Sequence, residues 1–357
     1  MNLKDVSVHR LINQNILATK TKTVRDVVFD MGAIQAQDYK MAKWAIGVRS
    51  PGSTELDVDH AIDNVEIIRT HVLRPTWHFV SPEDLIWMRE LTANKAKSLI
   101  NSRDKALGLT KAIIDKSKNI IEQALSNGEH LTGEELACKL EKNRIDTGSY
   151  RAWHLFYKAE LDGIICSGKN KNGKPTFALL DERVPISNKI IREEALFLLA
   201  KKYFTSHGPA TIDDFSWWSG LSIKECRKAV EMNKNAFISE KIGTQTYFFS
   251  SSFSYTKTNN KKVFLLPAFD EFIIAYKNRS ASLLPEQHKK TISNNGIFRP
   301  MIVVNGQITG IWKRTIQKDK VLIELNLFQS QSKEVKNLIK KEALKLGQFL
   351  NKKIEVL

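Results

Sequence analysis

The chain has 357 residues, of which 42% are hydrophobic and 26% are charged. This ordinary globular composition excludes a wholly disordered or fibrous protein, and at about 100–200 residues per domain the length predicts two or three domains. Lysine and arginine number 55 against 39 aspartates and glutamates, and the formal net charge of +16 favours a polyanionic partner such as nucleic acid. A generic solubilising charge is the alternative interpretation.

The first 90 residues alternate predicted helices with two predicted strands. We expect helices over 6–17, 23–32 and 54–63, and strands over 67–73 and 76–80. A new helix then begins, with Ser81 as its cap and Pro82 as its first residue. We interpret this region as a diverged copy of a repeated unit of helices followed by a hairpin, which the next two segments of the chain show more clearly.

Residues 118–180 show that unit most clearly. Helical stretches cover 119–125, 133–140 and 150–161, and Thr132 caps the second of them. Two strands over 164–168 and 176–180 flank a turn rich in Lys, Asn and Gly, which predicts a hairpin. Three helices followed by a hairpin is the order of elements in a winged helix.

A second copy of the unit lies at about 191–250. Its helices are expected over 193–204, 212–220 and 223–233, with caps at Thr211 and Ser222, and its strands over 236–243 and 245–250. We expect Trp217 and Trp218 to shape and pack this unit.

Beyond about residue 261 the pattern becomes strand-like. We expect strands over 263–276, 300–313 and 321–328, with a tight hairpin at Asn305 and Gly306, and then an amphipathic helix and a last strand. The whole pattern predicts an α+β fold of three tandem winged-helix units followed by a small, barrel-like β-rich domain. The predicted domains are 1–115, 116–188 and 189–260 for the three units and 261–357 for the β-rich domain.

Two glutamines in the first unit are the strongest candidates for chemistry. Gly32 can end the helix before them, and in an extended segment Gln35 and Gln37 point to one side and Ala36 to the other. Two amides aimed at one point can hold a water molecule by its proton and its lone pair. An ordinary polar loop is the alternative interpretation.

Five blocks in a fixed order carry a family resemblance: GAIQAQDYKMAKWAIGVR, THVLRPTWHFVSPEDLIWM, GPATIDDFSWWSGL, LLPAFDEFIIAYKNRS and GIFRPMIVVNGQITGIWKR. With these blocks the sequence resembles the winged-helix DNA glycosylases of the AlkZ/YcaQ type. The resemblance implies three winged helices and a C-terminal β domain around a basic concave surface. It also implies that Gln35-Ala36-Gln37 is the catalytic signature, in the Gln-apolar-Gln form of the branch that excises bulky alkylated bases and unhooks interstrand crosslinks.

The resemblance predicts a monofunctional DNA glycosylase that hydrolyses the N-glycosidic bond of cationic alkylated purines. A guanine alkylated at N7, or an adenine alkylated at N3, leaves as a neutral base, so no general acid is required. Gln35 and Gln37 are then expected to orient the water and to place oxygen dipoles near the developing sugar cation. Interstrand crosslinks are a further candidate substrate, and we expect no cofactor and no metal.

Other residues are secondary candidates. Asp38 is a candidate for stabilising the cation, and Thr76 and His78 for a place near the glutamines, although a histidine on a strand is equally often just packed. The candidates for DNA-phosphate contacts are Arg49, Arg69, Arg74, Lys169, Lys171, Lys174, Lys313 and Arg314. For the lysine-rich turn, a solvated loop is an equally good interpretation.

Asp270 and Glu271 form a pair of carboxylates within an apolar run. Paired carboxylates can do acid–base chemistry or hold a metal. Without a histidine at ligand spacing a metal site is weak, and we expect a structural role in which Asp270 pairs with Arg279 or Arg299.

The expected partner is double-stranded DNA that contains alkylated bases, with no membrane, no obligate protein partner and a monomeric protein. No apolar run approaches the roughly 18 residues of a membrane helix, the N-terminus lacks a signal-peptide core, and the three cysteines are too scattered for a disulfide framework. We therefore expect a cytoplasmic, nucleoid-associated protein of bacterial type. The alternative function is a non-catalytic winged-helix DNA-binding protein, regulatory or architectural; the intact Gln-Ala-Gln signature and the lack of an obvious dimerisation helix count against it.

Overall fold

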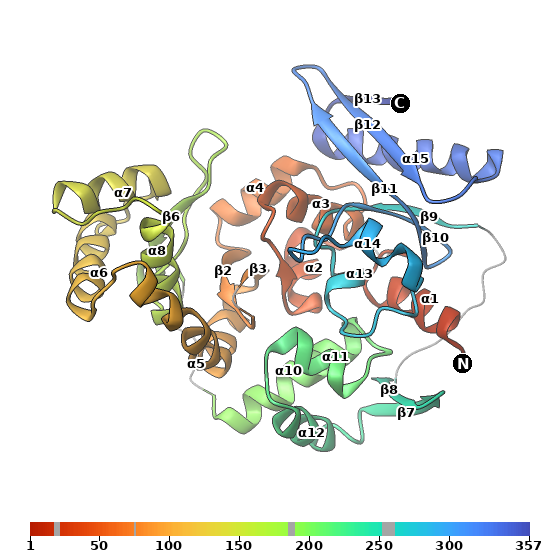
Figure 1. Ribbon diagram of the computed structural model, residues 1–357, viewed down its shortest axis with the longest axis horizontal. Coiled ribbons are helices and arrows are strands. Elements are labelled where there is room, and N and C mark those ends of the chain that lie inside the picture. Colours follow the sequence, from red (N-terminus) through yellow and green to blue (C-terminus); the bar gives the residue numbers. More distant parts are fainter. Residues whose placement is uncertain (18–21, 75, 185–189, 252–260) are drawn as a thin grey trace. The chain divides into compact units, whose positions relative to one another are not determined.

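The computed structural model describes residues 1–17, 22–74, 76–184, 190–251 and 261–357 (Figure 1). The chain forms two compact units, one made of Met1–Val58 with Leu196–Leu357 and the other of Asp59–Ala195. The first unit therefore joins the two ends of the chain. The predicted boundaries of three winged-helix units and a β-rich domain describe a finer division and stay a prediction.

Helices from both ends of the chain build much of the first unit. They are α1 (Leu3–Asn13), α2 (Val24–Met31), α3 (Tyr39–Arg49), α11 (Ile212–Ser219), α12 (Ile223–Met232), α13 (Glu271–Ile274), α14 (His288–Thr291) and α15 (Lys333–Leu350), with a 3-10 turn at Pro285–Gln287. Helices α4 (Glu55–Asp63) and α10 (Arg192–Ser206) include the residues at which the two units divide.

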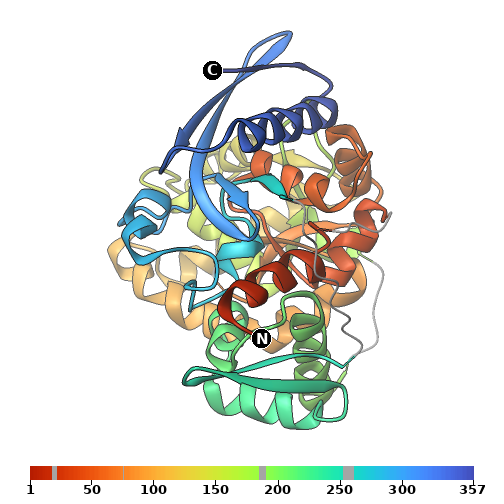
Figure 2. The same cartoon turned by 90° about the vertical axis from the view of Figure 1, so that its right-hand side faces the viewer.

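The C-terminal part of the first unit is a curled five-stranded sheet (Figures 1 and 2). Its strand order is β13-β12-β11-β10-β9, and only β12 and β13 run parallel. The strands are β9 (Val263–Leu266), β10 (Met301–Val304), β11 (Gln307–Ile316), β12 (Lys320–Leu327) and β13 (Lys353–Val356). Because α15 contacts both β9 and β13, it lies along the sheet from one edge to the other.

The sequence predicted this β-rich region and its hairpin at Asn305 and Gly306 correctly, because β10 and β11 pair up to Val304 and Gln307. It predicted the first strand too long. β9 ends at Leu266, and the helix α13 follows, because the side chain of Asp270 accepts the Phe272 N–H and caps that helix. An apolar run alone does not distinguish a buried strand from a buried helix.

A second hairpin of the first unit follows α12. It consists of β7 (Phe237–Ile242) and β8 (Gln245–Ser250), paired across Gly243 and Thr244 as predicted. Figure 2 shows it beside the helices α10 to α12, and the backbone bridge between Ala210 and Phe248 attaches it to the start of α11.

After the end of α4, the second unit continues with the hairpin of β2 (Ile68–Val72) and β3 (Thr76–Val80) and the long helix α5 (Pro82–Ala106). The following elements are α6 (Lys111–Leu125), β4 (Leu131–Thr132), α7 (Gly133–Lys142), α8 (Arg151–Asp162), β5 (Ile165–Ser167), β6 (Thr176–Leu179) and α9 (Leu180–Arg183). Strands β4, β6 and β5 form one antiparallel sheet, and Ile121, Leu136 and Leu155 from the three helices are buried together.

The predicted order of three helices and a hairpin is therefore present in 111–179 and again in 192–250. The predicted caps are also confirmed, because Ser81, Thr132, Thr211 and Ser222 each accept a backbone N–H in the first turn of their helix. The assignment of these segments to winged-helix units stays a prediction.

Candidate active site

The segment from Gln35 to Gln37 joins two helices of the first unit. Helix α2 ends at Gly32, whose φ of 76° suits a glycine, and α3 begins after Asp38, whose Oδ1 accepts a backbone N–H of that helix at 3.0 Å. Between them, β1 (Ile34–Gln35) is the only strand-like part, and Gln37 and Asp38 lie in a bend. Gln35 is 4% exposed, whereas Gln37 is exposed. The expected extended conformation thus holds at Gln35 and ends before Gln37.

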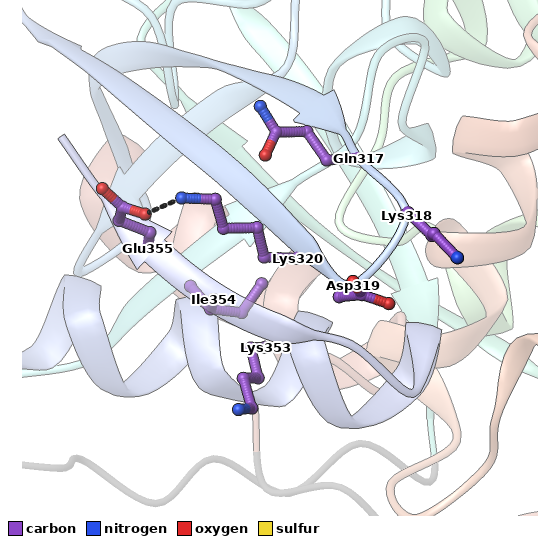
Figure 3. Close-up of a pocket in the computed structure, with 7 residues that line it drawn as sticks. All are labelled: Gln317, Lys318, Asp319, Lys320, Lys353, Ile354 and Glu355. Atoms are coloured by element: carbon purple, nitrogen blue, oxygen red, sulfur yellow. Dashed lines mark hydrogen bonds and ion pairs between the residues drawn. The ribbon is translucent and has the colours of Figure 1, made fainter.

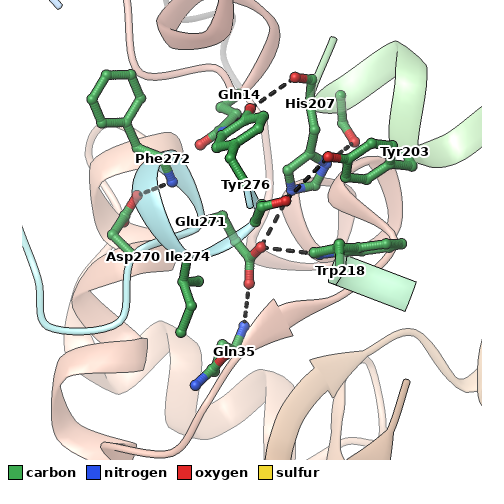
Figure 4. Close-up of polar contacts among 12 residues, drawn as sticks. Gln14, Gln35, Tyr203, His207, Trp218, Asp270, Glu271, Phe272, Ile274 and Tyr276 are labelled. Atoms are coloured by element: carbon green, nitrogen blue, oxygen red, sulfur yellow. Dashed lines mark hydrogen bonds and ion pairs between the residues drawn. The ribbon is translucent and has the colours of Figure 1, made fainter. Parts of the chain in front are cut away.

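A buried carboxylate lies behind Gln35 (Figure 4). The Oε1 atom of Glu271 accepts the backbone N–H of Gln35 at 2.7 Å, and its Oε2 atom accepts the indole N–H of Trp218 at 3.1 Å. The Nε2 atom of His207 lies 3.4 Å from the same Oε2. Glu271, Trp218 and His207 are all fully buried. Groups from β1, from α11 and from the residue after α10 therefore converge on one carboxylate.

The imidazole of His207 is enclosed on several sides. It stacks on the ring of Tyr203 with 5.0 Å between the centroids, and its Nδ1 lies 2.8 Å from the Oγ of Ser206. The hydroxyl of Tyr276 donates to the His207 carbonyl at 2.7 Å. Burial lowers the pKa of His207, although Glu271 opposes the shift. Burial of the ring therefore favours its neutral form.

Asp270, next to Glu271, forms a buried ion pair with Arg49. The two guanidinium nitrogens donate to the two carboxylate oxygens at 2.8 and 2.9 Å, and Nη2 also donates to the Oε1 of Gln14 at 2.7 Å. The predicted pairing of Asp270 with Arg279 or Arg299 is therefore wrong. Arg279 donates to a backbone carbonyl on α13, and Arg299 donates to one on α14.

The position of Arg49 does not fit the predicted contact with DNA phosphate. Its side chain has 0% exposed surface, and its guanidinium is held by Asp270 and Gln14. A residue without exposed surface cannot reach a phosphate, so we assign Arg49 to the support of the segment 270–274 and not to the DNA-binding surface.

Two of the predicted DNA contacts lie on β11 of the same unit as the glutamines. Lys313 is exposed and Arg314 is half-buried, and the Nη1 of Arg314 has no hydrogen-bond partner among the described residues. Burial lowers the pKa of Arg314, and the carboxylates of Asp38 and Glu55 oppose that shift. The charge of Asp38, the residue after Gln37, therefore acts on Arg314.

Comparison with known proteins decides the family. A family model described as DNA glycosylase AlkZ-like matches residues 28–349, which is most of the chain. The chain belongs to the AlkZ-like DNA glycosylase family. The interstrand DNA cross-link repair glycosylase of Streptomyces sahachiroi is 23% identical over 326 residues, with 87% of each protein covered. The solved structure of the DNA glycosylase AlkZ from Streptomyces sahachiroi covers 100% of both chains with a TM-score of 0.78 and 20% identity, which shows a common fold.

The predicted family and the predicted enzyme class, hydrolysis of N-glycosyl bonds, are thereby confirmed. The predicted α+β fold is confirmed as well, since the described residues combine helices with the curled sheet and align with the Streptomyces structure over its full length.

In this glycosylase the remaining site candidates lie on the β2–β3 hairpin of the second unit. His78 is fully buried, with its Nδ1 2.9 Å from the Thr76 carbonyl oxygen, and Thr76 is half-buried. Arg69 lies over the ring of Trp77 at 4.4 Å, and Arg74 is half-buried. Because Gln35 and Gln37 belong to the first unit, a place for Thr76 and His78 near the glutamines stays a prediction.

The lysine-rich turn of the second unit is partly neutralised. Lys171 pairs with Glu135 at 2.5 Å and Lys174 with Glu134 at 2.9 Å, both on α7. Lys169 is exposed, and its backbone N–H donates to a ring nitrogen of His130. Phosphate contacts by Lys171 and Lys174 would therefore compete with these ion pairs.

A pocket of about 510 Å³ lies at the turn between β11 and β12 (Figure 3). Lys318 and Lys353 are exposed at its edge, whereas Lys320 is bound to Glu355 at 2.6 Å. None of the predicted site residues lines this pocket, so we do not place the active site there.

Within the described ranges, no group of three or more His, Cys, Asp and Glu side chains is arranged to hold a metal ion. The expectation of a metal-free enzyme stays a prediction. None of the helices in those ranges is both long and apolar enough to cross a membrane.

Sequence reasoning missed the contacts behind Gln35. It treated Glu271 as structural and the two tryptophans as packing, yet Trp218 and Glu271 are joined to each other and to the candidate catalytic segment. The signal in the sequence was a pair of adjacent carboxylates, Asp270 and Glu271, within an apolar run, since carboxylates that are buried with such a run require specific donors.

Proposed function

We propose that this protein excises cationic alkylated purines from double-stranded DNA. The candidate lesions are N7-alkylguanine, N3-alkyladenine and interstrand crosslinks formed through such bases. Membership of the AlkZ-like glycosylase family supports this proposal, as does a Streptomyces relative named as an interstrand DNA cross-link repair glycosylase. The formal charge of +16 supports an electrostatic attraction to DNA that is independent of its sequence.

The reaction needs orientation more than acid–base chemistry. The bond between C1′ and the purine nitrogen breaks, and its electron pair neutralises the cationic base. Water then adds to C1′ and loses a proton to solvent, which leaves an abasic site. An amide does not titrate usefully, but it can hold a water molecule and present an oxygen dipole to the sugar cation.

Gln35 and Gln37 supply the two amides in this proposal. The observation that carries it is the placement of the segment: Gln35 is buried and anchored through its backbone by Glu271, and Gln37 is exposed in the bend that follows. Asp38 lies beside Gln37 with one oxygen used as the cap of α3, so it is a secondary candidate for stabilising the cation.

The surrounding elements are proposed to hold the duplex. In this view the segments 1–115, 116–188 and 189–260 act as winged helices and bind the duplex together with the C-terminal sheet, in a monomeric protein. The proposed phosphate contacts are Arg69, Arg74, Lys169, Lys171, Lys174, Lys313 and Arg314. Thr76 and His78 are kept as secondary candidates for the active site.

The deciding experiment is excision from a duplex that carries a single N7-alkylguanine, measured as alkali-labile strand breakage. We expect breakage by the wild-type protein, and a loss of at least about 10²-fold in single-turnover rate for Gln35→Ala and for Gln37→Ala with DNA affinity unchanged. Unchanged excision in both variants would remove the glutamines from the mechanism. Tight binding without breakage of either this duplex or a crosslinked one would favour the non-catalytic DNA-binding alternative.

A further inference from the structure

Glu271 is fully buried and so cannot touch DNA or water in the active site. It nevertheless makes a direct contact with the candidate catalytic segment, through the 2.7 Å bond from the backbone N–H of Gln35. In Figure 4 the side chain of Gln35 extends away from Glu271, so the contact with Glu271 is made by the backbone of Gln35 and not by its side-chain amide.

Glu271 is itself fixed from several directions. Trp218 donates to Oε2 at 3.1 Å, and His207 lies 3.4 Å from the same atom. The backbone at Glu271 is held by its neighbour Asp270, which caps α13 and binds both nitrogens of Arg49. The carboxylate therefore has little freedom to follow Gln35 if that residue moves.

Trp218 also supports the entry to the segment. A Cβ atom added to Gly32 would lie 3.7 Å from the indole of Trp218, so the indole packs against the point where α2 ends and the chain turns toward Gln35. Trp218 thus contacts Glu271 and also lies near the backbone three residues before Gln35.

Keeping a carboxylate in this position costs free energy, because a buried charge loses its hydration. An apolar side chain of similar volume would avoid that cost but would leave the Gln35 N–H without an acceptor. The requirement for an acceptor of the Gln35 N–H distinguishes Glu271 from a residue that only fills space in the core.

We propose that Glu271 is a positioning residue for the glycosylase reaction: by accepting the Gln35 N–H it fixes the backbone of β1 and thereby aims the Gln35 amide. This inference rests on the proposed role of Gln35. A displacement of about 1 Å at a reacting group can lower a rate by on the order of 10²-fold, so holding one peptide group in place has a measurable effect on catalysis.

The test compares two variants of Glu271 in the full-length protein. Glu271→Leu removes the acceptor, and we expect it to lower the single-turnover excision rate by about 10- to 10²-fold without weakening DNA binding. Glu271→Gln keeps an oxygen that can accept the Gln35 N–H, and we expect its rate to lie within about 3-fold of wild type. Equal losses in the two variants would overturn the positioning role, because the charge and not the acceptor would then carry the effect.

A control and a second variant keep the test independent of folding. The control is Glu225→Gln. Glu225 lies on α12 of the same unit, and its carboxylate also accepts a backbone N–H, from Ser222 at 3.0 Å. The excision rate of this variant should match wild type. Trp218→Phe removes one donor to Glu271 and keeps an aromatic ring, and we expect a rate loss of about 3- to 10-fold in the same direction as Glu271→Leu. All rates are measured below the onset of unfolding of each variant.

A double-mutant cycle with Gln35→Ala separates this inference from the proposed function. If Glu271 acts through Gln35, Glu271→Leu and Trp218→Phe should each slow the Gln35→Ala protein by less than about 2-fold. Full additive losses in that background would overturn the positioning role and leave the proposed function intact. An excision rate of Gln35→Ala equal to wild type would instead overturn the proposed role of Gln35, on which this inference rests, and absence of excision by the wild-type protein would overturn the proposed function.

Discussion

At the scale of single residues, the buried ion pair of Arg49 and Asp270 makes a prediction about stability. Removing one partner leaves the other as an uncompensated charge with no exposed surface. We therefore expect Arg49→Ala to lower the free energy of unfolding by about 3–5 kcal/mol, measured by urea denaturation. Lys313→Ala, at an exposed residue, is the control and should stay within about 0.5 kcal/mol of wild type. Equal stabilities of the two variants would contradict the structural role assigned to Arg49.

The same pair shows what a sequence can reveal about individual residues. The segment with Gln35 and Gln37 was recognisable from the spacing of the amides and from the family resemblance. The partner of Asp270 was not, since Arg49 lies 221 positions away and nothing local distinguishes it from the other arginines. For the same reason the apolar run around Glu271 indicated that its carboxylate needs a donor, but not that the donor is the N–H of Gln35, 236 positions away.

At the scale of elements, the start of α7 responds to pH through Glu135. Its Oε2 accepts the Thr132 N–H at 2.8 Å and its Oε1 binds Lys171, and these contacts hold the pKa of Glu135 at about 2 instead of the usual 4.5. A lowered carboxyl pKa contributes stability above pH 4.5 that is lost as the pH falls toward 2. We expect Glu135→Gln to lower the free energy of unfolding at pH 7, but by less than about 1 kcal/mol, because the ion pair of Glu135 and Lys171 is exposed to solvent. At pH 3.5 we expect the difference between the two proteins to be smaller than at pH 7.

The measurement is urea denaturation of both proteins at pH 7, 5 and 3.5. Glu134→Gln is the matched control, because Glu134 binds Lys174 without capping the helix. Its substitution should have a smaller effect at each pH, and a stability difference for Glu135→Gln that does not shrink on acidification would contradict the assignment.

Elements with local signals were predicted well, and elements defined by burial were not. The caps at Thr132, Thr211 and Ser222 and the turn at Asn305 depend on neighbours in sequence, and all are present. The apolar run over 263–276 predicts a single strand, although apolar residues in the core suit a helix equally well. Only the capping contact of Asp270 shows where the strand ends and α13 begins.

At the scale of the whole molecule, the sequence predicted a linear succession of finer units, which stays a prediction. It did not indicate that 1–58 and 196–357 join in one compact unit. The periodicity of apolar residues indicates secondary structure within segments of roughly ten to twenty residues. It carries no information on which distant segments pack together. The net charge of +16, unlike the packing of distant segments, is a property of the whole chain that can be calculated directly from the sequence.

That charge makes a prediction about binding to undamaged duplex DNA. Each phosphate neutralised by the protein contributes a slope of about −0.9 to the plot of log affinity against log salt, so six contacts would lower the affinity by about 10³-fold between about 50 and 200 mM salt. Arg314 is half-buried on β11 next to the exposed Lys313, and the charge of Asp38, the residue after Gln37, acts on its guanidinium, so we test it as a phosphate contact close to the glutamines. We expect Arg314→Ala to flatten the slope by about 0.9.

The control is Lys345→Ala. It removes the same charge from α15, where Lys345 binds Glu342, and should leave the slope unchanged. Equal slopes for wild type and Arg314→Ala would place Arg314 away from the DNA, and equal flattening in both variants would mean that the affinity depends on net charge and not on a defined contact beside Gln37.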